Sequence, residues 1–383
     1  MYNIKIYRSR ALLFFLLFPY IYPIGLDAIP VFKILFIIWG LVSMVCVVYL
    51  YFFRGFVVRL YPALIIVFHF FLLIITLYIN GDIPAGLKKL FLFPCAVLLC
   101  DLWCRKNPKL LLKTMLDVFF FEQIFNLLFW NVKIFENDQF LLGIRTDFPI
   151  VGFLTIYVAL LCRYLKIGGT KYKAYIAIVA SILSIFLAWV STGIVALLLL
   201  FALLVMIRFR WFERLLNFCD NTKLIPLGIF LNYGFVFSST SNIFSGFITS
   251  FLGESTDLNG RGIIWKLTLR AVAESPWLGY GVYGIYIEMP EWWGVSYNYV
   301  HTQSLQLLID GGIVALVCFL LILIVIGKEI NRGQDYFIKK LSTIVLFACM
   351  IMMIPEVITN YCWSFVLLTL LADSKVFAQL REE

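Results

Sequence analysis

Charged residues are what this sequence has least of. Asp, Glu, Lys and Arg together make up 14% of its 383 residues, whereas a soluble domain usually carries roughly a quarter. Hydrophobic residues account for 63% and aromatic residues for 18%, and the mean hydropathy is +0.97. This composition excludes a disordered chain, a fibrous repeat and a soluble α/β enzyme. It indicates a protein whose solvent is mostly lipid.

Histidine is scarce as well, with two in the chain. Cys100 and Cys104 lie one turn apart on a predicted helix, but no histidine is near them in the sequence. We therefore interpret the cysteines as small apolar core residues rather than metal ligands. The net charge is +9, yet the sequence contains no long basic stripe and no basic patch interleaved with aromatics. These absences argue against a nucleic-acid partner.

Apolar runs are abundant, and each membrane span needs about 20 such residues. The sequence predicts an all-α polytopic membrane protein with about 12 transmembrane helices. The predicted spans lie near 11–29, 34–53, 62–79, 87–104, 110–130, 149–165, 174–190, 193–207, 224–237, 313–327, 341–354 and 361–373. Several runs are shorter than a full span, so tilted or broken helices are expected there.

The loops between these runs differ in basic charge, which sets membrane orientation. With the N-terminus in the cytoplasm, 23 of the 31 Lys and Arg residues fall on the cytoplasmic side. Both termini are therefore predicted to be cytoplasmic. The chain divides into residues 1–237 with helices 1–9, one large external loop at 238–312, and residues 313–383 with helices 10–12.

The loop at 238–312 is the one extended polar stretch. Residues 261–274 are predicted to form an amphipathic helix at the membrane surface that ends before Pro276. The run GYGVYG at 279–284 is predicted to be a turn, because no strand precedes it as a dinucleotide motif would require. His301 then opens a short polar run that leads into the tenth span.

Four short patterns in this loop resemble the signature of a known family. They are Arg261-x-x-x-Trp265, Pro276-x-x-Gly279-x-Gly281, His301-x-x-x-Leu305 and Asp310-Gly311-Gly312. Together they resemble the O-antigen ligase/polymerase superfamily, which includes bacterial O-antigen ligases and Wzy-type O-antigen and capsule repeat-unit polymerases. The close match covers 261–312, and the predicted topology is similar over the whole chain.

Outside the loop, Arg145, just before the sixth span, also resembles the family's loop arginine. The sequence departs from the family pattern at two positions. Thr192 stands where many members carry an arginine, and Thr302 stands where many carry an asparagine after the histidine. No role for an arginine at position 192 can be carried over.

The resemblance implies a GT-C-like membrane glycosyltransferase in the bacterial inner membrane, with its active site on the periplasmic face. Its donor and acceptor would be undecaprenyl-pyrophosphate-linked oligosaccharides, transferred with inversion and without a metal or other cofactor. Membrane lipids surround such an enzyme, and a chain-length regulator and a flippase are the protein partners that the resemblance suggests. The loop contains no acidic D-x-D pair, as expected for metal-independent transfer.

Candidate residues follow from the chemistry that such a site needs. Arg145, Arg261 and Arg270 are predicted to bind the pyrophosphate, because a guanidinium forks onto phosphate oxygens. His301 is predicted to deprotonate or orient the acceptor hydroxyl, since an imidazole titrates near neutral pH. His301 and Arg261 are the predicted catalytic residues. Weaker sugar contacts are expected from Tyr280, Tyr283 and Trp265.

Each candidate also has a structural interpretation. The arginines could instead snorkel to lipid headgroups, and the aromatic side chains could anchor the loop at the interface. Ionisable residues inside predicted spans are functional candidates by default. Of these, His69 is predicted to be structural, and Asp117 and Glu122 are left without a role.

Three functions stay open. A repeat-unit polymerase is favoured, partly because Thr192 replaces an arginine. An O-antigen ligase that transfers glycan to lipid A–core is the alternative. A lipid-linked oligosaccharide transporter or flippase is the third, although matched halves with polar mid-span residues are not visible in the sequence. The sugar composition and linkage are not predicted.

Overall fold

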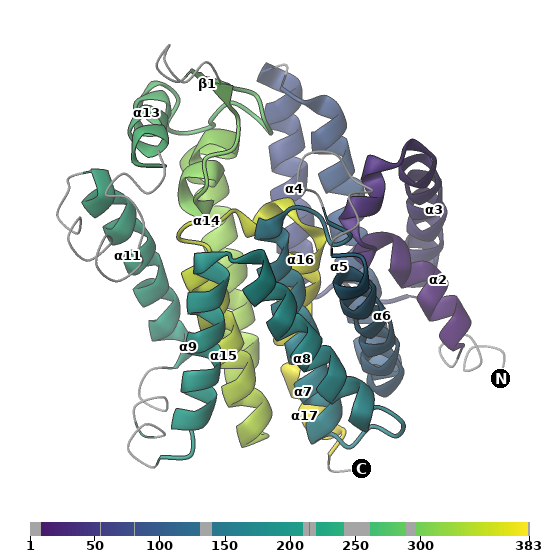
Figure 1. The fold of residues 1–383 in the computed structure, drawn as a ribbon. Coiled ribbons are helices and arrows are strands. Elements are labelled where there is room, and N and C mark those ends of the chain that lie inside the picture. The colour runs from purple at the N-terminus through teal and green to yellow at the C-terminus, as the bar shows by residue number, and fades with distance from the viewer. Residues whose placement is uncertain are drawn as a thin grey trace.

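The computed structural model describes residues 9–53, 55–79, 81–130, 140–209, 214, 220–240, 261–288 and 296–381. Helices dominate this part of the chain (Figure 1). They are α2 (Arg10–Ile21), α3 (Pro30–Val48), α4 (Leu60–Ile79), α5 (Ile83–Lys106), α6 (Pro108–Leu128), α7 (Phe148–Tyr164), α8 (Lys171–Ala188), α9 (Ser191–Met206), α11 (Asn221–Thr240), α13 (Arg261–Glu274), α14 (Gln303–Asn331), α15 (Tyr336–Met352), α16 (Cys362–Ala372) and α17 (Ser374–Gln379). Two short strands, β1 (Ile287–Glu288) and β2 (Ser296–Tyr297), pair antiparallel.

Six helical stretches are long and apolar enough to cross a membrane. They are Pro30–Phe53, Leu60–Ile79, Ile83–Lys106, Arg145–Tyr164, Lys171–Ala188 and Gln303–Asn331. The helices α2, α9 and α16 are apolar but shorter. The protein is therefore an all-α, multi-pass membrane protein. Each of the 12 predicted apolar runs overlaps a described helix, but 12 as the number of spans stays a prediction.

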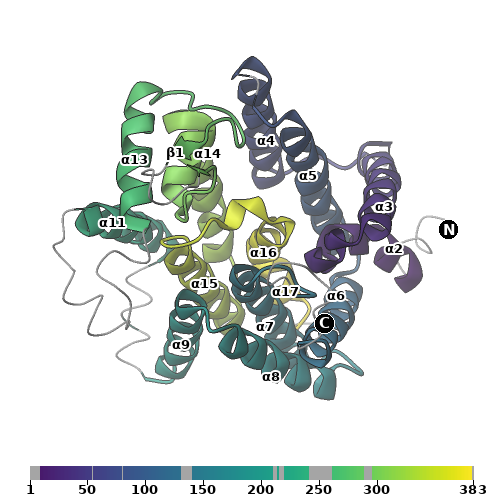
Figure 2. The same ribbon diagram turned by 45° about the horizontal axis from the view of Figure 1, so that its top comes forward.

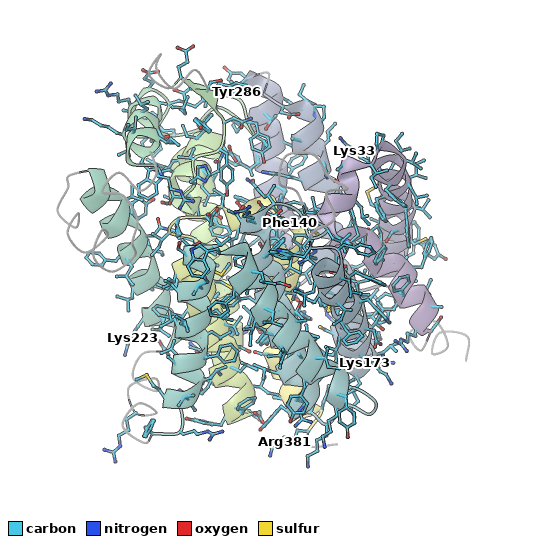
Figure 3. The ribbon with its side chains drawn as sticks, viewed as in Figure 1. Lys33, Phe140, Lys173, Lys223, Tyr286 and Arg381 are labelled. Atoms are coloured by element: carbon cyan, nitrogen blue, oxygen red, sulfur yellow. The ribbon has the colours of Figure 1, made fainter. Side chains whose placement is uncertain are left out.

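The helix bundle has two ends that differ in content. The start of α2 and the C-terminus lie toward one end, and α13 and β1 lie at the other (Figure 1). Figure 3 shows Lys173 and Arg381 toward the first end, and Lys33 and Tyr286 toward the second. The charge rule assigns Lys173 and Arg381 to one side of the membrane and Lys33 and Tyr286 to the other, in agreement with their places at opposite ends of the bundle. The compartment that each end faces stays a prediction.

Small residues allow α7 to sit deep inside the bundle. A Cβ at Gly152 would lie 2.7 Å from the side chain of Ile185 on α8, and one at Gly193 on α9 would lie 2.4 Å from Pro149. Lipid offers little hydrophobic drive for helix association, so close packing of this kind stabilises membrane bundles. The two glycines thus bring α8 and α9 close to α7.

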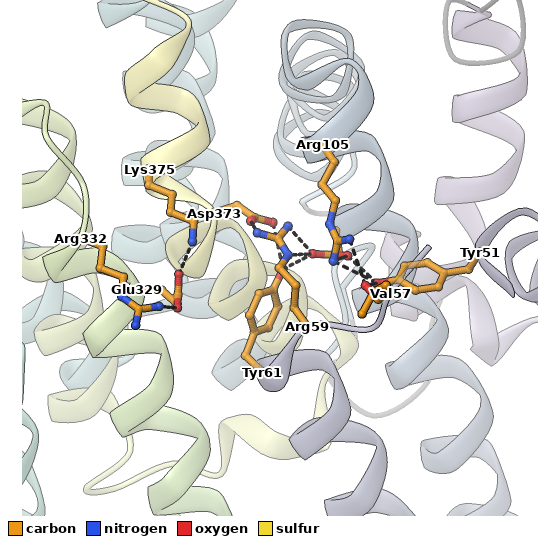
Figure 4. Close-up of polar contacts among 10 residues, drawn as sticks. Tyr51, Val57, Arg59, Tyr61, Arg105, Glu329, Arg332, Asp373 and Lys375 are labelled. Carbon is orange, nitrogen blue, oxygen red and sulfur yellow. Dashed lines mark hydrogen bonds and ion pairs between the residues drawn. The ribbon is translucent and has the colours of Figure 1, made fainter. Parts of the chain in front are cut away.

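A buried charge cluster ties three helices together at the end that is predicted to be cytoplasmic (Figure 4). The Asp101 and Asp373 side chains are fully buried, and Arg59 forms ion pairs with both. Arg105 pairs with Asp101 at 2.6 Å, and the Tyr61 hydroxyl donates to Asp101 at 2.7 Å. Two guanidinium groups thus compensate two carboxylates between α4, α5 and the junction of α16 with α17.

Removing one member of this cluster should destabilise the fold strongly. In Arg59→Met, one guanidinium faces two buried carboxylates, and an unpaired buried charge costs about 3–5 kcal/mol. We expect a marked drop in the thermal midpoint of the protein in detergent micelles. The matched control is Arg332→Met, because Arg332 is 66% exposed in its pair with Glu329 and surface pairs contribute at most about 1 kcal/mol. Equal shifts in the two variants would contradict the prediction.

Candidate active site

The helix α13 presents the first candidate residue and anchors it. Arg261 opens the helix, and Trp265 follows one turn later on the same face. The Trp265 side chain is fully buried, and its indole N–H donates to the carbonyl oxygen of Val300 at 2.8 Å. The Arg-x-x-x-Trp spacing thus lets the tryptophan fix the helix against the segment that carries His301. The predicted bounds of this helix are confirmed.

Arg261 forms an ion pair with a residue that the sequence analysis did not single out. Its Nη2 atom lies 3.3 Å from Oε1 of Glu356, which belongs to the segment 353–361 between α15 and α16. The Tyr299 hydroxyl donates to Oε2 of Glu356 at 3.1 Å. Burial raises the pKa of Glu356 to about 7, and the nearby Arg261 opposes this shift. The carboxyl therefore titrates near neutral pH.

His301 lies beside this pair. Its ring meets the Tyr299 ring edge-on, with centroids 4.6 Å apart. Burial and the charge of Arg261 lower the pKa of His301 to about 4, so the imidazole is neutral at pH 7. Its Nδ1 atom is buried and has no hydrogen-bond partner among the described residues. A neutral imidazole can accept a hydrogen bond from a substrate hydroxyl.

The backbone at His301 is held in an unusual conformation. The residue has φ +55°, a left-handed region that costs energy for residues other than glycine and persists where the surroundings enforce it. The preceding residue, Val300, is fixed through its carbonyl by Trp265 and through its N–H by Gln306 Oε1 at 3.0 Å. The imidazole is therefore positioned from both α13 and α14.

The predicted turn at 279–284 packs against the Asp310-Gly311-Gly312 motif in α14. The helix α14 is kinked at Gly311 and Gly312, and there the N–H of Tyr280 donates to the carbonyl of Ile309 at 2.6 Å. Gly279 has φ +63°, and a Cβ there would lie 2.4 Å from that same carbonyl. Only glycine allows this approach. The turn at 279–284 is confirmed, and it packs into the kink.

The structure does not bring the three predicted arginines together. Arg270 is exposed and follows Arg261 by nine positions, which places it about half a turn around the helix and roughly 13 Å along it. Arg145, in the short helix η3 (Arg145–Asp147), is exposed, and its guanidinium lies 5.9 Å from the centre of the Phe140 ring. Neither contacts Arg261 among the described contacts.

Arg145 nevertheless lies on a segment that borders the site. Asp147, two residues later, accepts from the N–H of Ile144 at 3.0 Å and interacts electrostatically with Tyr361 and Glu356. The segment 353–361 therefore contacts both η3 and α13. Arg145 could reach a substrate at this border, whereas Arg270 faces away from it.

The three aromatic candidates have separate roles in the structure. The full burial of Trp265 leaves no ring face for a sugar, which contradicts that expectation; its role is to anchor α13. The hydroxyl of Tyr280 donates to the carbonyl of Ala271 at 2.8 Å and braces the end of the helix. Tyr283 lies under the Nζ atom of Lys89, 5.0 Å from its ring centre, and lines a cavity of about 270 Å³.

The structure also shows what surrounds the ionisable residues inside the predicted spans. His69 is buried among the Phe68, Phe93 and Phe365 rings, in agreement with a structural role. Asp117 pairs with Arg10 and Lys173. Glu122 is buried, and neither carboxyl oxygen has a hydrogen-bond partner among the described residues. In the same part of the chain, no group of three His, Cys, Asp or Glu side chains could hold a metal ion.

Sequence reasoning missed Glu356 and Lys89. Glu356 follows an apolar run at the end of a predicted span, and nothing in its neighbourhood resembles a motif. Lys89 lies inside a predicted span, and the rule that intramembrane charges are functional candidates would have found it. Both residues meet their partners only through tertiary contacts.

These features define a multi-pass membrane protein whose loop helix, glycine turn and kinked helix hold an arginine beside a neutral histidine. Residues 176–320 match the family model of O-antigen ligase. The match covers less than half of the chain and shows that this part is similar to the O-antigen ligase family. The matched range includes Arg261, the turn, His301 and the kink. A search among curated proteins found no match.

Proposed function

We propose that the protein polymerises undecaprenyl-pyrophosphate-linked repeat units into O-antigen or capsular polysaccharide. The observation that carries the proposal is the placement of Arg261, Glu356, Tyr299 and His301 around one point. A guanidinium there can bind a diphosphate, and a neutral imidazole can accept a proton. The membrane enclosure suits a substrate with a lipid tail.

The transfer requires one bond to form and one to break. The oxygen of an acceptor hydroxyl attacks the anomeric carbon of the donor and forms the new glycosidic bond with inversion. The bond from that carbon to the diphosphate oxygen breaks, and its electron pair leaves with undecaprenyl diphosphate. The hydroxyl proton passes to His301. Arg261, with Arg145 at the border, stabilises the charge that develops on the diphosphate.

Donor binding also makes His301 a stronger base. In the free protein, the charge of Arg261 contributes to the low pKa of His301. A diphosphate bound to Arg261 brings negative charge beside the imidazole, and a nearby negative charge favours the protonated form. The pKa of His301 therefore rises when the donor is present, and the imidazole becomes a stronger base.

The pH dependence of stability tests the shifted pKa values of His301 and Glu356. The pKa of His301 is lowered from 6.5 to about 4 on folding, so the unfolded state binds more protons in that window and stability rises with pH. The pKa of Glu356 is raised from 4.5 to about 7, so stability falls as pH rises. The two effects oppose each other in the wild type.

Single variants should separate them. Other buried carboxyls, such as Asp147 with its pKa raised to about 7, also titrate in this window, so each variant is compared with the wild type. Between pH 4.5 and 6.5, we expect the thermal midpoint of Glu356→Gln in detergent to fall less steeply with pH than that of the wild type, and the midpoint of His301→Asn to fall more steeply. Slopes equal to the wild-type slope in both variants would show that these groups do not carry the predicted shifts.

A ligase is the second candidate, and one observation favours it: the matching family model is described as O-antigen ligase. The polymerase preference rests on Thr192, at the start of α9, where many members carry an arginine. Both activities use the same donor chemistry and differ in the acceptor. The proposed setting is the bacterial inner membrane with both termini cytoplasmic and the site periplasmic, where a flippase and a chain-length regulator are the proposed partners.

The test uses purified protein in lipid nanodiscs, supplied with undecaprenyl-pyrophosphate repeat units from the source strain. A ladder of products on the lipid carrier, resolved by gel, is the expected result. Transfer that occurs only after lipid A–core is added would make the protein a ligase. No transfer in either case, together with lipid-linked oligosaccharide movement across proteoliposomes, would favour a transporter.

A further inference from the structure

The segment 353–361 has a second charged neighbour on its other side. Its Glu356 faces Arg261, whereas Asn360, at the end of η6 (Ile358–Asn360), accepts a hydrogen bond from Lys89 Nζ at 2.7 Å. In Figure 2 this yellow stretch before α16 lies between α13 and α14 on one side and α4 and α5 on the other. The two basic residues thus flank one short segment.

Lys89 is a buried cation without an ion-pair partner among the described residues. It is 8% exposed, and its closest contacts are the neutral amide of Asn360 and the face of Tyr283. Asp82 and Asp310 act on it electrostatically, but neither forms an ion pair with it in the described part of the chain. A buried charge normally requires direct compensation. An anion that binds next to Lys89 would provide it.

The space for such an anion is present. A cavity of about 270 Å³ opens between α2, α5 and the start of α16, and Lys89 lies on its wall. This volume is several times the roughly 30 Å³ share of one water molecule. The lining includes the aromatic rings of Tyr20, Tyr22 and Tyr283 and a second lysine, Lys88. Lys88 is half-exposed, and its Nζ lies 3.7 Å from an oxygen of Asp27.

We propose that this cavity binds the diphosphate of a second polyprenyl-linked saccharide, with Lys89 as the anion ligand. This inference rests on the proposed function, since polymerisation uses two substrates that each carry a lipid diphosphate. Arg261 binds the diphosphate of the donor, and Lys89 binds that of the acceptor. The segment 353–361 separates the two, and the acceptor saccharide spans the distance to His301.

The binding stoichiometry tests the proposal without requiring turnover. Full-length protein in phosphatidylcholine nanodiscs is titrated with undecaprenyl diphosphate, and bound lipids are counted by native mass spectrometry. We expect two lipids for the wild type and one for Lys89→Gln. The matched control is Lys33→Gln, which removes an exposed lysine at the same end of the bundle and should leave two. One lipid in the wild type, unchanged in Lys89→Gln, would overturn the proposal.

A second variant distinguishes loss of the anion site from a folding defect in Lys89→Gln. Asn360→Asp places a carboxylate where the amide now accepts from Lys89, so an internal ion pair competes with the diphosphate. We expect this variant to lose the second lipid while its thermal midpoint is maintained or increased. Lys89→Arg retains the cation and should retain the second lipid. Two lipids bound to Asn360→Asp would contradict the assignment.

Competition identifies the source of the phosphate group. Inorganic diphosphate should displace the second lipid, because the lysine recognises the phosphate group itself. Excess phosphatidylglycerol should not displace it; if it did, the cavity would be a general headgroup site and the substrate assignment would fall. The gel ladder tests the proposed polymerase activity, and the lipid count tests the second site, so either proposal can fail without the other. Two lipids without a ladder would refute the polymerase, and a ladder with one lipid would refute the second site.

Discussion

Replacing His301 with asparagine is expected to abolish visible polymer formation and to lower the transfer rate about 10²–10⁴-fold, the usual contribution of a general base. Asparagine tolerates the left-handed backbone that the residue adopts at φ +55°, so the variant removes the imidazole while it retains the local fold. The measurement is the product ladder in nanodiscs, with membrane abundance determined in parallel.

The chain contains its own matched control. His69 is the other histidine, and it is buried on α4 with its Nδ1 2.8 Å from the carbonyl oxygen of Ile65. Phenylalanine fits among the aromatic rings that surround it, so His69→Phe should retain activity close to wild type. A normal ladder in His301→Asn, or a loss of activity in His69→Phe alone, would reverse the roles assigned to the two residues.

The local elements of this protein were readable from the sequence because their signals are local. The amphipathic pattern of 261–274 and the proline at 276 predicted α13, and clustered glycines predicted the turn at 279–284. The apolar runs predicted the helices. The resemblance to the family also rested on short patterns, and the match over 176–320 supports it.

The partners of the candidate residues were not readable, since they come from distant parts of the chain. Arg261 and Glu356 are 95 positions apart, and Lys89 and Asn360 are 271 apart. No periodicity or motif connects such pairs. Rotation around a helix also mattered: a shared charge suggested that Arg261 and Arg270 act together, but nine positions place them on opposite faces.

The burial of Trp265 shows a related limit. A tryptophan in an external loop suggested contact with sugar or lipid, because aromatic side chains favour both. The structure uses its indole N–H to hold Val300, beside the histidine. Composition predicts that such a residue matters, whereas its function depends on what packs around it. The same holds for Asp101 and Asp373, whose pairing with Arg59 and Arg105 requires three helices to meet.

Arg261→Lys is expected to lower transfer about 10²–10³-fold, which is the usual cost of losing one donor that stabilises developing charge. Among the described residues, Glu356 is the one hydrogen-bond partner of the guanidinium, so its other N–H groups are free to fork onto a diphosphate. Lysine retains the charge but cannot form the paired contacts. The measurement is single-turnover transfer from a labelled donor in nanodiscs.

The matched control lies on the same helix. Arg270→Lys makes the same chemical change on the exposed face of α13, and Arg270→Gln also removes the charge. Both should retain near wild-type transfer, because the structure turns this residue away from Glu356 and His301. Near-full activity in Arg261→Lys would show that charge alone suffices. A loss in Arg270→Lys equal to that in Arg261→Lys would favour the sequence-based expectation that both arginines bind the pyrophosphate.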